Sequence, residues 1–251
     1  MNALIIAERE FKTLFVAPLA WIVLAVLEAL AAFMFLTQVE KFMRLQKTLA
    51  LIDNAPGLTD IIVLPLYGNV GILLLLATPL LTMGVIASER RYKTLCLLLS
   101  APISSADIIL GKFLTSWGLL LVLLLLLTLM PLSLLLGGSL DMGKLVSNCL
   151  ALALLSAAFT ATGIYFSTLS SHPVAAAISS FGLLLLLWIL DWTSSFSDEP
   201  SPILTYLSLL KHFQHLQTGL LSSMDVIFFL LYTGLFLFLS IRHLDKLRKH
   251  P

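Results

Sequence analysis

Charged residues are scarce in this sequence of 251 residues. Asp, Glu, Lys and Arg make up only 12% of the chain, whereas a soluble domain carries about 25%. Hydrophobic residues make up 59%, and a domain of this size has no core large enough to bury so many apolar side chains. Lipid is therefore the solvent that the composition requires.

Cysteine and the signatures of enzymes are scarce or missing too. Cys96 and Cys149 are the only cysteines, which excludes a disulfide framework, and we expect two unpaired thiols. The formal net charge of +1 argues against a broad basic face for nucleic acid. The sequence has no Walker A loop, H-E-x-x-H, G-x-S-x-G or C-x-x-C. We therefore expect no catalytic residue, no metal ligand and no cofactor in this chain.

Long hydrophobic runs, in contrast, are abundant. Six stretches are long enough to cross a bilayer, which takes about 20 residues of helix. They are Leu19–Thr37, Ile61–Ala87, Phe113–Leu136, Leu145–Leu169, Val174–Trp192 and Val226–Ile241. The sequence thus predicts an all-α membrane protein with six transmembrane helices in a single transmembrane domain, residues 1–251. We expect no cleavable signal peptide, because the first apolar run is too long for one.

Three segments outside these runs have helical spacing of apolar residues. Asn2–Phe15 is amphipathic and predicts a helix lying in the membrane interface. Phe42–Ile52 predicts a second, separate amphipathic helix after the first span. Residues 203–220 are too polar for a seventh span, and we interpret them as interfacial or re-entrant. Within them, His212 and His215 have metal-ligand spacing, but without a nearby carboxylate or cysteine two interfacial histidines are the favoured interpretation.

The orientation in the membrane follows from the basic residues. Six spans place both termini on one side, and ten of the 15 Lys and Arg residues lie in segments on that side. Lys and Arg are enriched on the cytoplasmic side of membrane proteins. The sequence therefore predicts that both termini are cytoplasmic.

Two acidic residues lie in or next to predicted spans. Glu28 is near the middle of the first span, where an ionisable group is costly and is a functional-site hypothesis by default. A protonated or hydrogen-bonded glutamate at a helix interface is one interpretation, and a residue of the transport pathway or of a dimer interface is the other. Asp191 stands beside Trp188 and Trp192, as expected at a wet membrane interface.

The segment between the second and third spans, Ser88–Phe113, combines a charged patch, a short apolar stretch, a break at Pro102 and a returning helix. Ser104 or Ser105 is a suitable cap for that helix, and Asp107 suits its positive end. Its apolar residues favour either a loop lying on the bilayer or a docking element for a cytoplasmic partner.

This segment resembles the coupling segment of ABC-2 type transporter permeases, approximately E-R-x-x-G-T-L-E-x-L-L-x-x-P-[IV]-S and then I-x-x-G-K-F. Lys93 stands where Gly is usual and Cys96 where Glu is usual. Pro79-Leu-Leu-Thr-Met83 resembles the gliding-motility-type branch, although Gly84 stands where that branch often has Arg. The amphipathic start and the residues before the last span are similar to the family too, so the resemblance covers nearly the whole chain. The matching residues of the coupling segment are Glu89, Arg90, Thr94, Leu95, Leu98, Leu99, Pro102, Ile103, Ser104, Ile109, Gly111, Lys112 and Phe113.

The resemblance implies a permease subunit of an exporter in a bacterial inner membrane. It would pair with a second copy or a homologue, and a separate cytoplasmic ATPase subunit would hold ATP and Mg. Asn2–Phe15 would frame the cytoplasmic gate. The Leu-rich spans weakly favour a hydrophobic or lipid-linked cargo. The residues that would dock on the ATPase are Glu89, Arg90, Arg91, Thr94, Leu95, Leu98, Leu99 and Pro102.

Two other functions fit six spans. One is a membrane scaffold or mechanotransmission subunit of an envelope complex, which transports no solute. The other is a channel or secondary transporter that works without ATP. Against the latter, Glu28 is the only central ionisable residue of the spans, which is few for an ion or proton relay.

Overall fold

The computed structural model describes residues 2–16, 18–49, 57–95, 103–136, 139–196, 206–219 and 222–249, and its elements within these ranges are all helices. The short π-helix η1 (Thr59–Val63) leads into α3, and the 3-10 turn η2 (Leu134–Leu136) follows α6. The α-helices are α1 (Asn2–Val16), α2 (Pro18–Leu49), α3 (Leu64–Thr82), α4 (Ala87–Arg91), α6 (Ser105–Ser133), α7 (Met142–Leu169), α8 (Pro173–Phe196), α10 (Leu209–Gln217) and α11 (Ser223–Lys249).

Six helices are long and apolar enough to cross a membrane, namely α2, α3, α6, α7, α8 and α11. They coincide with the six predicted stretches. Large apolar side chains stand bare on their outer faces, for example Phe33 on α2 and Leu231 on α11, which is the arrangement that lipid rather than water favours. The prediction of an all-α, multi-pass membrane protein is confirmed.

The core of the bundle is built around α7, which contacts α3, α6, α8, α10 and α11. In its most apolar stretch of 18 residues, 67% of the residues are buried inside the protein, against 17% in the corresponding stretches of α2 and α11. Small residues let the neighbours approach closely: a Cβ on Gly163 would stand 1.9 Å from the Thr82 hydroxyl of α3. Small residues at such contacts are typical of helix packing in membranes.

The predicted helix Phe42–Ile52 is wrong as a separate element. α2 continues without a break to Leu49, and the end of the predicted helix lies outside the described residues. Neither Gly nor Pro interrupts the stretch after the apolar run, so nothing in the sequence ends the helix there. The exposed pair of Glu40 and Arg44, at 2.6 Å, lies along the surface of the same helix.

The start of α6 agrees with its predicted cap. The Ser104 hydroxyl oxygen accepts a hydrogen bond from the Asp107 backbone N–H at 3.0 Å. The same hydroxyl donates to the Asp107 carboxylate at 2.7 Å. Ser104 is therefore the cap, and the returning helix and the third span form one continuous helix.

α10 is too short to cross a membrane, since nine residues make a helix of about 14 Å. The predicted helix over residues 203–220 is thus confirmed as a non-spanning element, in the part that the structure describes. Its last carbonyls are bound by α7: Ser147 donates to Leu216 at 2.5 Å and Asn148 to Gln217 at 3.1 Å. These side chains satisfy groups that a helix leaves free at its C-terminus.

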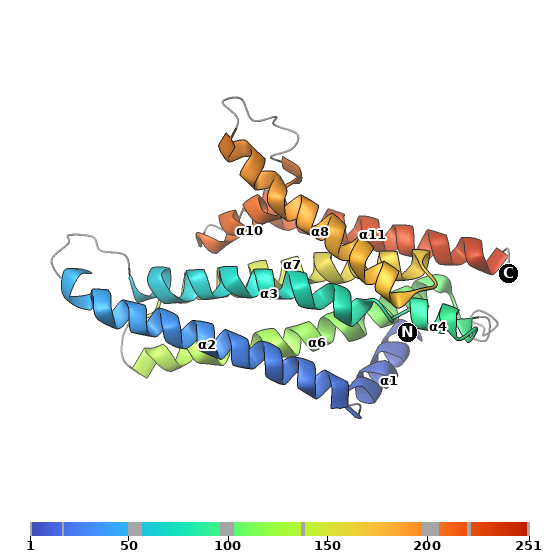
Figure 1. Cartoon of the computed structure of the whole chain (residues 1–251), viewed down its shortest axis with the longest axis horizontal. Helices are drawn as coiled ribbons and strands as arrows, with labels where there is room; N and C mark the ends of the chain where they lie inside the picture. Colours follow the sequence, from blue (N-terminus) through green and yellow to red (C-terminus); the bar gives the residue numbers. More distant parts are fainter. Residues whose placement is uncertain are drawn as a thin grey trace.

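The bundle has two distinct ends (Figure 1). Both termini, α4 and the start of α6 lie at one end, which we call the α4 end. α10 lies toward the opposite end, the α10 end, with the start of α3. The shared location of the termini agrees with an even number of spans.

Candidate functional site

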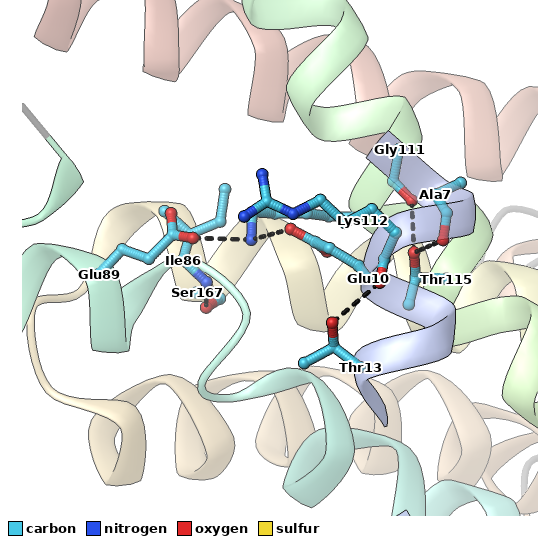
Figure 2. Close-up of polar contacts among 10 residues, drawn as sticks. Ala7, Glu10, Thr13, Ile86, Glu89, Gly111, Lys112, Thr115 and Ser167 are labelled. Carbon is cyan, nitrogen blue, oxygen red and sulfur yellow. Dashed lines mark hydrogen bonds and ion pairs between the residues drawn. The ribbon is translucent and has the colours of Figure 1, made fainter. Parts of the chain in front are cut away.

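A buried lysine joins three elements at the α4 end. Lys112, in the second turn of α6, has a side chain that is only 6% exposed. Its Nζ lies 2.9 Å from Glu10 Oε1 of α1 and 2.9 Å from Glu89 Oε1 of α4, and Figure 2 shows it extending between the two carboxylates. Burial of a charge is tolerated when it is paired in this way. We call these three residues the Lys112 cluster.

Glycines and a threonine on α6 allow α1 to reach the Lys112 cluster. A Cβ on Gly111 would lie 2.8 Å from Ile6 Cγ2, so a larger residue does not fit there. One turn on, the Thr115 hydroxyl lies 3.2 Å from the Ala7 carbonyl oxygen and 2.9 Å from that of Gly111. A Cβ on Gly118 would lie 3.2 Å from Phe11. Small residues on α6 thus form the surface on which the amphipathic α1 packs.

One hydroxyl orients α4 after the break that follows α3. The Ser167 side chain, near the C-terminus of α7, accepts hydrogen bonds from the backbone N–H groups of Ile86 and Ala87, each at 3.0 Å. It also donates to the Met83 carbonyl at 2.9 Å. These N–H groups at the start of a helix have no partner within it. Ser167 therefore holds the direction of α4 from outside, as Figure 2 shows for Ile86.

Arg90 fastens α4 to the same end of α7. Its guanidinium donates to the carbonyl oxygens of Thr168 and Leu169, at 3.4 and 3.1 Å. The C-terminus of a helix carries partial negative charge and free carbonyls, which favour a cation. The position predicted to contact an ATPase is thus bonded within the chain, and so is Glu89.

The turn after α4 explains why glycine is usual at position 93 in the coupling segment that this sequence resembles. The Thr94 N–H donates to the Glu89 carbonyl at 2.9 Å and the Lys93 N–H to the Arg90 carbonyl at 3.2 Å. This pair of bonds defines a Schellman motif, whose left-handed position is usually glycine. Lys93 occupies it with φ of 58°, so the departure from the family pattern retains the backbone shape at a conformational cost.

The outer side of this turn is bare. Arg91, Tyr92, Lys93 and Thr94 are exposed, Tyr92 to 72%, whereas Leu95 is buried. We call α4 with residues 92–95 the α4 turn. Its inner side is bonded to α6 and α7, and its outer side offers two cations and an aromatic ring. Of the other predicted docking residues, Leu98, Leu99 and Pro102 lie outside the described residues, as does Cys96.

A cavity of about 680 Å³ lies beside the Lys112 cluster. It is lined by residues of α1, of the first turn of α2, of α3 and the segment after it, of α4 and of the first turns of α6, with Ile103 just before them. The charged side chains on its wall are Arg9, Glu10, Glu89 and Lys112. Arg9 is exposed and, in contrast to Lys112, makes no ion pair with any residue that the structure describes.

Two residues that the sequence analysis singled out, Glu28 and Cys149, lie within spanning helices. Glu28 lies on α2 next to the buried residues Leu24 and Leu27, and its Oε1 atom is buried without a hydrogen-bond partner in the described part of the chain. Its role in a pathway or a dimer interface stays a prediction. Cys149 is free, as predicted, and its sulfur lies 3.1 Å from the Tyr67 hydroxyl.

The two histidines of α10 lie against the carboxylate of Asp225. His212 Nδ1 lies 2.5 Å from Asp225 Oδ1 of α11, and His212 Nε2 lies 2.9 Å from the Tyr206 carbonyl oxygen. No group of three potential metal ligands occurs among the described residues. His215 Nδ1 is 3.9 Å from the other oxygen of Asp225. Asp225, the partner that the sequence did not reveal, is only 5% exposed.

Sequence reasoning included Glu89 and Arg90 but missed the residues around them that hold α1 and α4 in place. Glu10 and Ser167 were not candidates, and Lys112 was noted only as part of a motif. A lysine in an otherwise apolar helix requires a counter-charge, so Lys112 itself was open to prediction. The choice of Glu10 was not, because it comes 102 residues earlier in the chain.

Six spanning helices, an amphipathic N-terminal helix and an α4 turn bonded to the spans define a multi-pass helical membrane protein. The chain belongs to the ABC-2 transporter family: the model described as ABC-2 family transporter protein matches residues 4–246. Members of this family are generally non-catalytic membrane subunits that work with a cytoplasmic ATPase. No curated protein matches the chain.

Proposed function

We propose that this chain is the permease subunit of an ABC-2 exporter in a bacterial inner membrane. A separate cytoplasmic ATPase subunit, with ATP and Mg bound to it, drives the exporter. The observation that carries the proposal is the two-sided α4 turn, with Glu89 and Arg90 bonded inward and Arg91 and Tyr92 facing outward. A docking element that transmits motion needs both a free side for the partner and a firm connection to the spans.

The contacts of the α4 turn give the path of the motion. A displacement of α4 acts on α6 and α1 through Lys112, and on α7 through Arg90 and Ser167. ATP drives such a change when it binds one state of the assembly more tightly than the other. The amphipathic α1, bonded to the Lys112 cluster, moves with α4 and frames the cytoplasmic gate.

The predicted docking residues divide into two roles in this proposal. Arg91 and Thr94 face the partner, and Leu98, Leu99 and Pro102 continue the docking element. Glu89 and Arg90 transmit force within the permease. Leu95 is buried, and its packing inside the protein holds the turn in place.

The remaining parts of the proposal concern orientation and assembly. The excess of Lys and Arg on the side of the termini supports a cytoplasmic location for the α4 end. The bare apolar faces of α2 and α11 supply surface for a second permease copy or a homologue, with lipid covering the rest. The resemblance of Pro79–Met83 supports the gliding-motility-type branch of the family.

Co-purification tests the proposal. The full chain, tagged and solubilised in mild detergent, is expected to bring down an ATPase subunit. Arg91→Glu combined with Tyr92→Ala should lose that subunit. The matched control is Arg44→Glu, which reverses an exposed cation on α2, far along the chain from the α4 turn. Reversal of Arg90 is a poor probe, because it would also break the contact with α7.

Two results would count against the proposal. If the folded wild-type chain brings down no ATPase, the scaffold or the ATP-independent transporter takes its place. If the ATPase is retained equally by both variants, it docks elsewhere than on the α4 turn. An ATPase that co-purifies without solute transport would favour the mechanotransmission subunit.

A further inference from the structure

The cavity at the α4 end changes from charged to apolar along its depth. On α6 its wall runs from Lys112 through Thr115 and Ser116 to Leu119. On the opposite side it runs from Glu89 back through Val85 to Leu81. Both series proceed from the end of the bundle toward the middle of a span. Two separate parts of the chain thus present the same gradient, charged at the end of the bundle and apolar toward the middle of the spans.

This gradient matches an amphiphile that stands along the bilayer normal. The volume of about 680 Å³ falls within the range of about 300–1,000 Å³ that is usual for small-molecule sites. A phospholipid headgroup with its glycerol has the required sequence of charge, polar ester and hydrocarbon. A soluble polar metabolite would leave Leu81 and Leu119 against water, and a purely apolar ligand would leave the charges of the wall without solvent.

The charges on the wall narrow the choice of headgroup. Lys112 is shared by two carboxylates, so the Lys112 cluster has one negative charge in excess when all three groups are ionised. Arg9 supplies a positive charge that no described residue pairs. The wall therefore presents one unbalanced centre of each sign. A zwitterionic headgroup satisfies both, whereas an anionic one satisfies only Arg9.

We propose that this cavity binds phosphatidylethanolamine. The phosphate lies against the Arg9 guanidinium, which binds phosphate through paired N–H groups. The primary ammonium lies against Glu10, whose side chain is 34% exposed and accepts hydrogen bonds that a trimethylammonium cannot donate. The hydroxyls of Thr13 and Ser116 face the glycerol esters. The site is independent of the proposed docking of an ATPase, since it uses the opposite side of the α4 turn.

Native mass spectrometry of the purified full chain tests the site. Phosphatidylethanolamine, phosphatidylcholine and phosphatidylglycerol with identical acyl chains are offered in equal amounts. We expect phosphatidylethanolamine to be retained preferentially. Arg9→Gln should lower its retention about tenfold or more, which is the effect of losing a hydrogen bond to a charged group. Lys12→Gln is the matched control, because Lys12 lies on the same helix and pairs with Glu8 on its exposed face.

A second variant tests the cavity without changing a charge. Ser116→Leu fills part of the space beside Leu119 and should also lower retention, while the midpoint of thermal unfolding reports that the bundle remains folded. Equal retention of the three lipids, or unchanged retention in both Arg9→Gln and Ser116→Leu, would overturn the proposal. Soluble glycerophosphoethanolamine is included as a competitor. If it displaces the lipid at equal concentration, the site recognises a free phosphoamine and the assignment to a membrane lipid is wrong.

Discussion

The two ends of the molecule each contain a buried polar cluster, but the two clusters are built differently. At the α4 end, Lys112 joins α6 to residues that lie 102 and 23 positions away in the chain. At the α10 end, His212 joins α10 to Asp225, only 13 positions away. The first cluster connects three separate elements, and the second closes one local corner between successive helices.

The groups in the two clusters differ in chemistry as well. A paired lysine stays charged across the physiological range, whereas histidine changes its charge there more readily than other side chains. The ring nitrogens of His212 face two oxygens, one of the Asp225 carboxylate and one of the Tyr206 carbonyl. The difference teaches that the Lys112 cluster joins three elements far apart in the chain, whereas His212 and Asp225 join two successive helices.

The largest expected effect comes from breaking the connection at the α4 end. Lys112→Met leaves two carboxylates without their shared cation and should lower the free energy of unfolding by about 4 kcal/mol. The loss is measured by denaturant unfolding in detergent. Lys144→Met, which breaks the more exposed pair with Asp60 at 2.6 Å, should cost clearly less, because solvent screens an exposed pair. Equal losses for the two lysines would contradict the special role of the Lys112 cluster.

The corner at the α10 end should respond less strongly. His212→Leu strands Asp225 and should lower the free energy of unfolding by about 3 kcal/mol. The loss is smaller than for Lys112 because one carboxylate is stranded instead of two, and His215 lies 3.9 Å from it. The control is His215→Gln, which removes a ring that is 61% exposed. If that change is as costly as His212→Leu, then His212 is not the partner that matters.

The contact between α1 and α6 at the α4 end can also be tested by a substitution that changes no charge. Gly111→Ala places a methyl group 2.8 Å from Ile6 and should cost about 2 kcal/mol through overpacking. A cross-link between cysteines introduced in α1 and α6 should form more slowly in this variant. Gly182→Ala in α8 is the control, because nothing lies within 4 Å of its Cβ position. That change should be neutral or stabilise the helix slightly, so a loss there would point to a general intolerance of larger residues.

The smallest effect concerns the shape of the α4 turn. Lys93→Gly relieves the left-handed conformation at φ of 58° and should raise the free energy of unfolding by about 1 kcal/mol. Lys93→Ala removes the same charge but keeps the strained conformation, so it should give no gain. Limited proteolysis of the turn measures the difference locally. A gain in both variants would attribute the effect to the charge of Lys93 and not to the backbone.

The spanning helices and several local details could be predicted from the sequence. Apolar length alone located the six spanning helices, and the order Ser104, Ser105, Asp107 predicted the start of α6 within one residue. Helical continuity was harder, because the first span ends as an apolar run long before α2 ends at Leu49. Hydropathy reports where lipid begins, whereas helix propensity decides where the helix stops, and the two positions differ here.

The site itself was only half predictable. The charged residues after the second span stand out in an apolar sequence, and so Glu89 and Arg90 were found. Their orientation was not predictable, since it depends on Lys112, which bonds Glu89, and on Ser167, which bonds the first N–H groups of α4. Both residues reach α4 only through packing. Ser167 is one of several hydroxyl residues near the end of α7, and no pattern in the sequence distinguishes it from the others.

The hydrogen bonds of Ser167 also have a consequence for biogenesis. Ser167 accepts hydrogen bonds from the N–H groups of Ile86 and Ala87, which are synthesised 81 and 80 residues before it. At a synthesis rate of about 5–20 residues per second, that interval lasts about 4–16 s. During this time α4 has been made, whereas the residue that orients it has not. The surface that we assign to the ATPase therefore takes its final direction only when the fourth span has been inserted, so a half-made permease does not yet present it.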